Sequence, residues 1–163
     1  MLMRRARPEE YATIGELTLA AYEPFLLGPE DIYRARLADT ATRDAEAEVW
    51  VATEDGPDAT VLGAVTICAP GSHWREIARE GEGEFRMLAV DPTVRGRGVG
   101  RALATMVIDR FRLEGDRRVV LSSLDMMRDA HRLYERLGFA RAPERDWRPQ
   151  PGVSLIVYTL ELT

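Results

Sequence analysis

The chain has 163 residues, and its 22 Lys+Arg side chains are all arginine, because the sequence contains no lysine. With 27 aspartates and glutamates the formal net charge is −5, which argues against a general nucleic-acid binder. The lack of lysine excludes a phosphate loop ending in Gly-Lys-Ser/Thr and a lysine Schiff base. Any bound anion must therefore be held by arginine, backbone N–H groups or helix termini.

The length suits one domain, and 45% hydrophobic residues are enough for a core. No apolar stretch is long enough to span a bilayer, and the start of the chain lacks the apolar segment of a secretory signal. A lone Cys68 argues against a disulfide framework, and two histidines, His73 and His131, make a histidine-based metal site unfavourable. We expect one soluble, cytoplasmic domain over residues 1–163, with no metal and with neither a nucleic acid nor a membrane as partner.

Hydrophobic spacing and turn residues predict alternating helices and strands along the chain. In chain order they are a strand over 2–7, a helix from Pro8 through Ala21, a short helix over 30–37, strands over 49–52 and 61–67, a loop with one helical turn over 70–83, a strand over 84–90, a helix over 99–113, a strand over 119–121, a helix over 129–137 and a strand over 153–162. This order predicts an α+β, or mixed α/β, fold with a single sheet.

The charge is spread unevenly along the chain. Residues 23–60 carry ten acidic side chains and three arginines, whereas residues 93–101 carry three arginines and no acid. One acidic lobe and one short cationic loop are candidates for two binding surfaces. Ordinary solvated faces are the alternative interpretation of the acidic lobe.

The segment Arg95–Arg101 carries the strongest functional signal, because it follows a predicted strand and begins an amphipathic helix. Its glycines at 96, 98 and 100 let backbone N–H groups converge, and the helix N-terminus adds unpaired N–H groups and partial positive charge. These features predict a pyrophosphate site. The dinucleotide pattern Gly-x-Gly-x-x-Gly fails, because its third glycine would fall at Arg101. A glycine-rich turn without a ligand is the alternative.

Two motifs in this region resemble those of the GNAT acetyltransferase superfamily. Arg95-x-x-Gly98-x-Gly100 matches the family's acyl-CoA loop, and the match extends back to the segment 88–92. The second motif, residues 130–139, is similar to the family's segment Ala-x-x-Leu-Tyr-x-x-x-Gly-Phe. Together the matches cover about residues 84–140, and their order and spacing agree with the family.

The resemblance implies a mostly antiparallel mixed sheet of about six to seven strands, splayed at an acyl-CoA site and flanked by about four helices. Acetyl-CoA would be the cosubstrate, with its pyrophosphate on the loop amides and its pantetheine arm along the preceding strand. No metal is implied. The cofactor-binding residues would be Leu88, Ala89, Val90, Arg95, Gly96, Arg97, Gly98, Val99, Gly100 and Arg101.

Two residues match catalytic positions of the family. Tyr134 would protonate the departing thiolate, and a core tyrosine is the alternative. Glu84 aligns with a glutamate that serves as base in some members and would take the proton of the attacking amine; a surface glutamate is the alternative. A backbone N–H near Leu88 would hold the oxyanion. Met127 departs from the family, which has an asparagine in contact with the coenzyme at that position.

The resemblance favours an N-acetyltransferase that moves an acetyl group from acetyl-CoA to a primary amine of a small molecule or protein by direct attack. The acidic lobe would favour a cationic acceptor, and a homodimer is left open. His73 and Trp147 are candidates for the acceptor pocket, whereas Cys68 is interpreted as a small core residue. A non-catalytic acyl-CoA-binding or sensing module of the same fold is the alternative function, and a larger acyl group or an oxygen acceptor also stays open.

Overall fold

The structure is a computed structural model that describes all residues, 1–163, as one eight-stranded sheet with five α-helices. The strands are β1 (Leu2–Arg5), β2 (Glu48–Thr53), β3 (Val61–Cys68), β4 (Glu82–Val90), β5 (Arg118–Leu124), β6 (Ala140–Arg141), β7 (Trp147–Gln150) and β8 (Val153–Glu161). The helices are α1 (Tyr11–Tyr22), α2 (Tyr33–Ala38), α3 (Thr40–Glu46), α4 (Val99–Glu114) and α5 (Arg128–Arg136).

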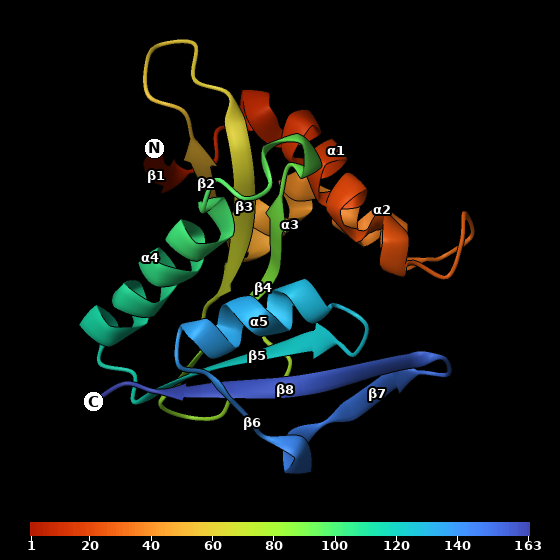
Figure 1. Cartoon of the computed structure of the whole chain (residues 1–163), viewed down its shortest axis with the longest axis vertical. Coiled ribbons are helices and arrows are strands. Elements are labelled where there is room, and N and C mark those ends of the chain that lie inside the picture. The colour runs from red at the N-terminus through yellow and green to blue at the C-terminus, as the bar shows by residue number, and fades with distance from the viewer.

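The sheet is antiparallel except at its centre. Its strand order is β1-β2-β3-β4-β5-β8-β6, with β7 also paired to β8, and only β4 and β5 run parallel. Helices α1, α2 and α3 lie on one face and α4 and α5 on the other (Figure 1). The α1 face buries Ile14 against Val49 and Val51, and the α4 face buries Leu103 against Leu62 and Val65. This architecture confirms the expected mixed fold.

Several details differ from the expectation of six to seven strands and four helices. The additional helix α3 buries Thr40 and Arg43 rather than an apolar stripe, so hydrophobic spacing gave no signal for it. Strand β6 has two residues, and β7 contains Pro149, which lowers its strand propensity. Residues 70–81 form turns without a helical turn. The remaining predicted elements are present, with boundaries shifted by a few residues.

The central parallel pair, β4 and β5, is joined over a short length. Three residue pairs connect the strands, and the last joins Glu84 to Val120. Beyond that point β4 bulges away, because the register against β3 shifts between Ala64 and Thr66. Within this bulge Met87 has a φ of +52°, the only positive φ outside glycine. Figure 1 shows the result, since β2, β3 and β4 run upright while β5, β7 and β8 cross beneath them.

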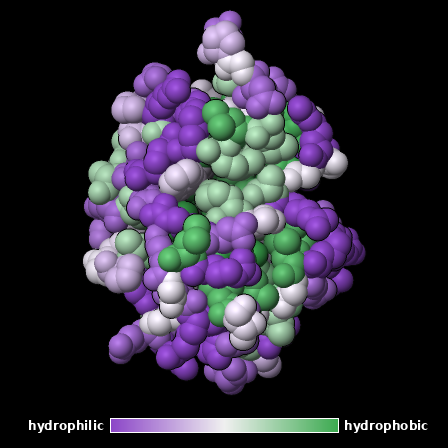
Figure 2. Space-filling view, turned by 90° about the vertical axis from the view of Figure 1, so that its left-hand side faces the viewer, coloured by the Kyte–Doolittle hydropathy of each residue, from purple (hydrophilic) through white to green (hydrophobic).

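Hydrophobic side chains also gather among hydrophilic ones on the face that carries α4 and the edge strand β1, as Figure 2 shows. A groove on this side runs along α4 against β1 and β2, and its lining includes Met3, Trp50, Met106 and Leu113. Leu113 is 88% exposed. Apolar surface therefore continues beyond the core beside α4.

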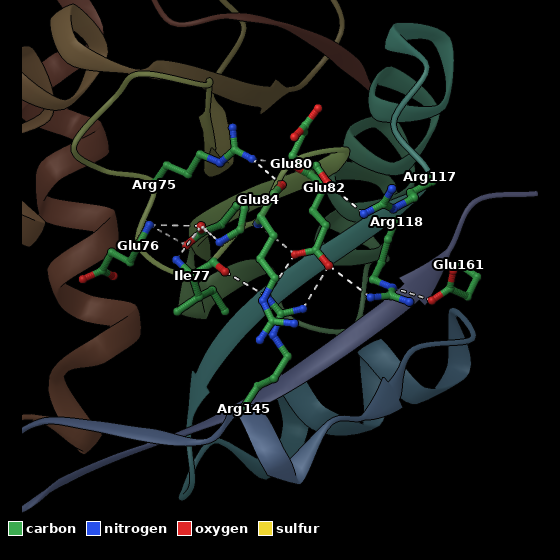
Figure 3. A network of polar contacts seen from close by, with 12 residues as sticks. Arg75, Glu76, Ile77, Glu80, Glu82, Glu84, Arg117, Arg118, Arg145 and Glu161 are labelled. Atoms are coloured by element: carbon green, nitrogen blue, oxygen red, sulfur yellow. Dashed lines mark hydrogen bonds and ion pairs between the residues drawn. The ribbon is translucent and has the colours of Figure 1, made fainter.

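The segment that leads into β4 is held by charged side chains (Figure 3). The Glu82 carboxylate is 1% exposed and accepts hydrogen bonds from Arg145 at 3.0 and 2.9 Å and from Arg118 at 3.1 Å. Burial alone would raise the pKa of Glu82, but the bonds from Arg145 and the Arg79 N–H outweigh it and lower this pKa to about 2. Arg145 also donates to the Ile77 carbonyl at 2.8 Å, so the β6–β7 connection fixes residues 77–82.

The cost of losing the Glu82 carboxylate follows from its burial. Glu82→Gln should lower the free energy of unfolding by about 3–5 kcal/mol, because Arg145, 7% exposed, would keep a buried charge without its partner. Glu161→Gln is the matched control, since it removes the other partner of Arg118, is 59% exposed and should cost less than about 1 kcal/mol. Urea unfolding at pH 7 measures both, and equal small losses would contradict the role of this pair.

Glu82 also predicts how stability depends on acid. Its folded pKa of about 2 lies below the ordinary value of 4.5, so the carboxylate contributes fully above pH 4.5 and its contribution is lost as the pH falls through 2. Unfolding free energies between these pH values should therefore fall more steeply for the parent protein than for Glu82→Gln. Parallel curves would show that the carboxylate is not held in its charged form by the fold.

Candidate functional site

A pocket of about 210 Å³ occupies the gap where β4 and β5 diverge. Seventeen of its 28 lining residues are hydrophobic. They come from both faces of the sheet: from the α1–α2 region, from β4 after its pairing ends, from the end of β5, from α5 and from the β7–β8 hairpin. The lining residues include Tyr22, Leu26, Leu27, Asp31, Tyr33, Arg36, Glu76, Phe85, Arg86, Leu88, Asp125, Met127, Tyr134 and Trp147.

A set of free backbone donors lies at the N-terminus of α4. Gly98 caps the helix with a φ of +80°, and Gly96 has a φ of +83°, a region that side chains rarely tolerate. The first N–H of this helix with an acceptor is that of Ala102, which bonds to the Gly98 carbonyl. The N–H groups at 98–101 therefore remain free, and Arg95 and Arg101 form no ion pair. This arrangement suits a pyrophosphate, as the sequence predicted.

Strand β4 supplies a second row of donors beside the pocket. The N–H of Asp91 bonds to the Leu62 carbonyl of β3. Since N–H directions alternate along a strand, the N–H groups of Val90 and, after the bulge at Met87, of Leu88 are expected to face the opposite edge, which β5 has left. An extended amide chain could pair with this edge as an added strand. The expected pantetheine site therefore has the required open edge.

Tyr134 lies where the expected acid should be. It comes from α5, is 6% exposed and lines the pocket. Its ring packs edge-on against Phe85 and Phe139, with centroids 6.1 and 5.8 Å away, and its hydroxyl forms no hydrogen bond within the protein. Burial raises the pKa of this phenol, which therefore keeps its proton at neutral pH. The side chain is thus both a core residue and a donor available to a ligand.

Glu84 occupies a different environment from the one a base needs. It is 1% exposed and absent from the pocket lining. Its carboxylate accepts the N–H groups of Glu76, Ile77 and Ala78, each at 3.0 Å to Oε2 (Figure 3). Burial raises the pKa of this carboxyl, although these N–H groups oppose the rise. Its contacts hold the backbone of residues 76–78 beside β4.

Several polar residues of the pocket were not predicted from the sequence, among them Tyr22, Tyr33, Glu76 and Arg86. Arg86 on β4 pairs with Glu76 at 2.9 Å and donates to the Tyr33 hydroxyl at 3.3 Å and to the Trp74 carbonyl at 3.1 Å. Tyr22 of α1 also lines the pocket, and its hydroxyl forms no hydrogen bond. One signal was available, because an arginine within the apolar strand that runs from Phe85 to Val90 needs a buried partner.

Of the other residues considered in the sequence, one lines the pocket and the rest lie outside it. Trp147 lines the pocket and donates to the Ser122 hydroxyl at 3.0 Å. His73 lies outside the pocket and pairs with Glu46. His131 is buried, and its Nε2 contacts the Ser123 hydroxyl at 3.1 Å, which ties α5 to β5. Cys68 is 2% exposed, and burial raises its pKa to about 12, as suits a core residue.

The structure contains no group of three or more His, Cys, Asp or Glu side chains arranged to hold a metal ion. None of its helices has both the length and the apolar character needed to cross a membrane. The candidate ligand-binding features of the chain are the loop at α4, the open edge of β4 and the pocket between them.

Several curated proteins share sequence with this chain, among them a mycothiol acetyltransferase and an N-acetylaspartate synthetase. A mycothiol acetyltransferase of Salinispora tropica is 34% identical over 140 residues, which cover 77% of this chain and 45% of the relative. An N-acetylaspartate synthetase of Danio rerio is 38% identical over 71 residues, covering 44% of this chain and 25% of the relative. The chain thus spans a quarter to less than half of the length of these relatives.

The fold is shared with solved structures over the full chain. A structure of yncA from Salmonella typhimurium with its cofactor acetyl-CoA has a TM-score of 0.67 and 25% sequence identity, and the match covers 100% of this chain and 94% of that one. The model of the acetyltransferase (GNAT) family matches residues 11–139. These residues contain the α4 loop, the open edge of β4 and Tyr134, and the chain belongs to the GNAT acetyltransferase family.

Proposed function

We propose that this protein transfers an acetyl group from acetyl-CoA to an amine by direct attack. One observation carries the proposal. The free N–H groups of residues 98–101 lie at the end of the open edge of β4, and this edge leads to the pocket that Tyr134 lines. An anion held at the loop and an extended arm along β4 would place a thioester in this pocket. The resemblance to a structure that contains acetyl-CoA supports the same choice of cosubstrate.

The coenzyme site uses backbone groups for most of its contacts. The N–H groups of Gly98, Val99 and Gly100 would hold the pyrophosphate, and the guanidinium groups of Arg95 and Arg101 would add charge. The N–H groups of Leu88 and Val90 would pair with the amides of the pantetheine arm. A backbone N–H near Leu88 would also stabilise the negative charge that develops on the thioester oxygen.

The proton of the attacking amine needs an acceptor in the pocket. An alkyl ammonium has a pKa of about 10, so at neutral pH a general base such as a carboxylate or a histidine would take its proton, directly or through water. Glu76 lines the pocket, whereas the sequence candidate Glu84 does not. We assign the base to Glu76 and a positioning role to Glu84, which holds the Glu76 N–H at 3.0 Å.

Tyr134 is assigned as the general acid that protonates the departing thiolate. The hydroxyl has no partner in the protein, and burial raises its pKa, so it keeps its proton at neutral pH and can donate it to the departing sulfur. The atoms then balance: the amine nitrogen forms a bond to the acetyl carbon, the carbon–sulfur bond breaks, Glu76 takes the amine proton and Tyr134 supplies the thiol proton.

Tyr134→Phe tests the assigned acid. Turnover of a primary amine should fall by about 10²-fold, while the dissociation constant of acetyl-CoA changes by less than threefold, because the ring stays packed and no internal hydrogen bond is lost. The assay follows free thiol release, with acetyl-CoA binding measured by calorimetry. Tyr158→Phe is the matched control, since this neighbouring hydroxyl bonds to Glu135 outside the pocket. Undiminished turnover in Tyr134→Phe would remove the acid role, and binding of acetyl-CoA without turnover of any amine would favour a non-catalytic module.

Glu76→Gln and Glu84→Gln test which of the two glutamates acts as the base and which one positions it. In steady-state assays at pH 7, Glu76→Gln should lower kcat by about 10²-fold, because it removes the carboxylate that takes the amine proton. Glu84→Gln should lower the unfolding free energy and reduce kcat less, because the groups it disturbs are backbone N–H groups. The opposite pattern, in which Glu84→Gln lowers kcat by the larger factor, would return the base to Glu84.

A further inference from the structure

The acceptor half of the pocket contains a guanidinium group that the protein leaves unused. Arg36 of α2 lines the pocket, yet its side chain forms no hydrogen bond and no ion pair. A guanidinium carries five N–H donors in a planar fork that matches a carboxylate. Arg34, two residues earlier on the same helix, pairs with Glu23 at 2.8 Å and lies outside the pocket. Arg36 is therefore distinguished by its place rather than by its residue type.

Arg36 contacts buried residues through both its guanidinium group and its backbone carbonyl. Its guanidinium carbon lies 4.6 Å from the centroid of the Trp74 ring, a cation–π contact. The Trp74 indole is itself immobile, because it is 3% exposed and donates to Glu46 at 2.7 Å. At the backbone, the buried Arg43 donates to the Arg36 carbonyl at 2.8 Å. Arg36 is an exposed residue, and these contacts reduce the conformational entropy that its side chain loses when it binds a ligand.

The other charges of this half of the pocket are satisfied within the protein. Asp31 accepts the N–H groups of Leu27 and Tyr33 at 2.9 Å, and Glu76 pairs with Arg86. The Tyr33 hydroxyl accepts from Arg86, so its own proton remains free to donate. Tyr33 and Arg36 lie three residues apart on α2, and both line the pocket.

The pocket lining also contains one carboxylate without a partner, and it does not come from the α1–α2 region. Asp125, at the end of β5, forms no ion pair and no side-chain hydrogen bond. The pocket thus offers one unpaired cation from α2 and one unpaired anion from β5, separated by mostly hydrophobic lining. This differs from the cationic acceptor suggested by the acidic residues 23–60, because Asp31 is the only acid of that lobe in the lining and its carboxylate is already bound.

We infer that Arg36, with the Tyr33 hydroxyl, forms a carboxylate subsite, so that the acceptor is an aminocarboxylate whose amine is acetylated while its carboxylate is held by α2. The inference rests on the proposed function, since it specifies the acceptor of the same pocket. Leu26 and Leu27, which line the same region, would contact an apolar body of that acceptor.

The test compares compounds that differ only by a carboxylate. Rates are measured for glycine, β-alanine, γ-aminobutyrate and phenylalanine, each beside the amine that lacks its carboxylate, such as phenethylamine for phenylalanine. The carboxylate-bearing member of the preferred pair should show at least a tenfold higher kcat/KM. Arg36→Ala should reduce that ratio at least tenfold, Arg36→Lys less, and Arg34→Ala should leave it unchanged.

A binding measurement decides the inference independently of turnover. With coenzyme A present, calorimetry compares N-acetylphenylalanine with N-acetylphenethylamine, and the N-acetylated forms of the other pairs likewise. At least tenfold tighter binding of a carboxylate form, lost in Arg36→Ala and kept in Arg34→Ala, supports the subsite. Equal binding within every pair, no binding of any compound, or a preference that survives Arg36→Ala overturns it. Turnover of amines without any carboxylate preference would overturn the subsite and leave the proposed acetyl transfer intact.

Discussion

The site depends on the fact that β4 and β5 stop pairing after a short length. These strands share three residue pairs and then separate at a bulge, where Met87 adopts a φ of +52°. The separation removes hydrogen-bond partners from one edge of β4 and opens the pocket between the two faces of the sheet. A sheet normally satisfies both edges of a central strand, so an open central edge is retained where a ligand completes it.

Buried charged side chains at the start of β4 stabilise the backbone beside this opening. Glu82 and Glu84 lie two residues apart at the start of β4, and both are buried, but they are neutralised differently. Glu82 binds arginine side chains, whereas Glu84 binds three backbone N–H groups. Together they place Glu76 beside Arg86 at the pocket wall. The absence of lysine agrees with this design, because planar guanidinium groups bridge carboxylates and carbonyls in several directions.

The parts of the structure that follow from local sequence were predictable. Glycines at 96, 98 and 100 before an amphipathic helix indicated the loop and its free N–H groups, and the motif around Tyr134 indicated a tyrosine at the pocket. The support of the site depends on contacts between distant residues and was not predictable. Arg145 reaches Glu82 across 63 positions and Arg86 reaches Tyr33 across 53, and no periodic pattern records such pairs. The orientation of Glu84 toward residues 76–78 had no sequence signal either.

The central claim is that the open edge of β4 and the first turn of α4 together bind acetyl-CoA through backbone N–H groups. Amide hydrogen exchange with and without acetyl-CoA measures these groups directly. The account predicts slower exchange at Leu88, Val90 and residues 98–101, with little change at the edge strand β1. Saturation with acetyl-CoA that leaves Leu88 and Val90 exchanging at their original rates would contradict it.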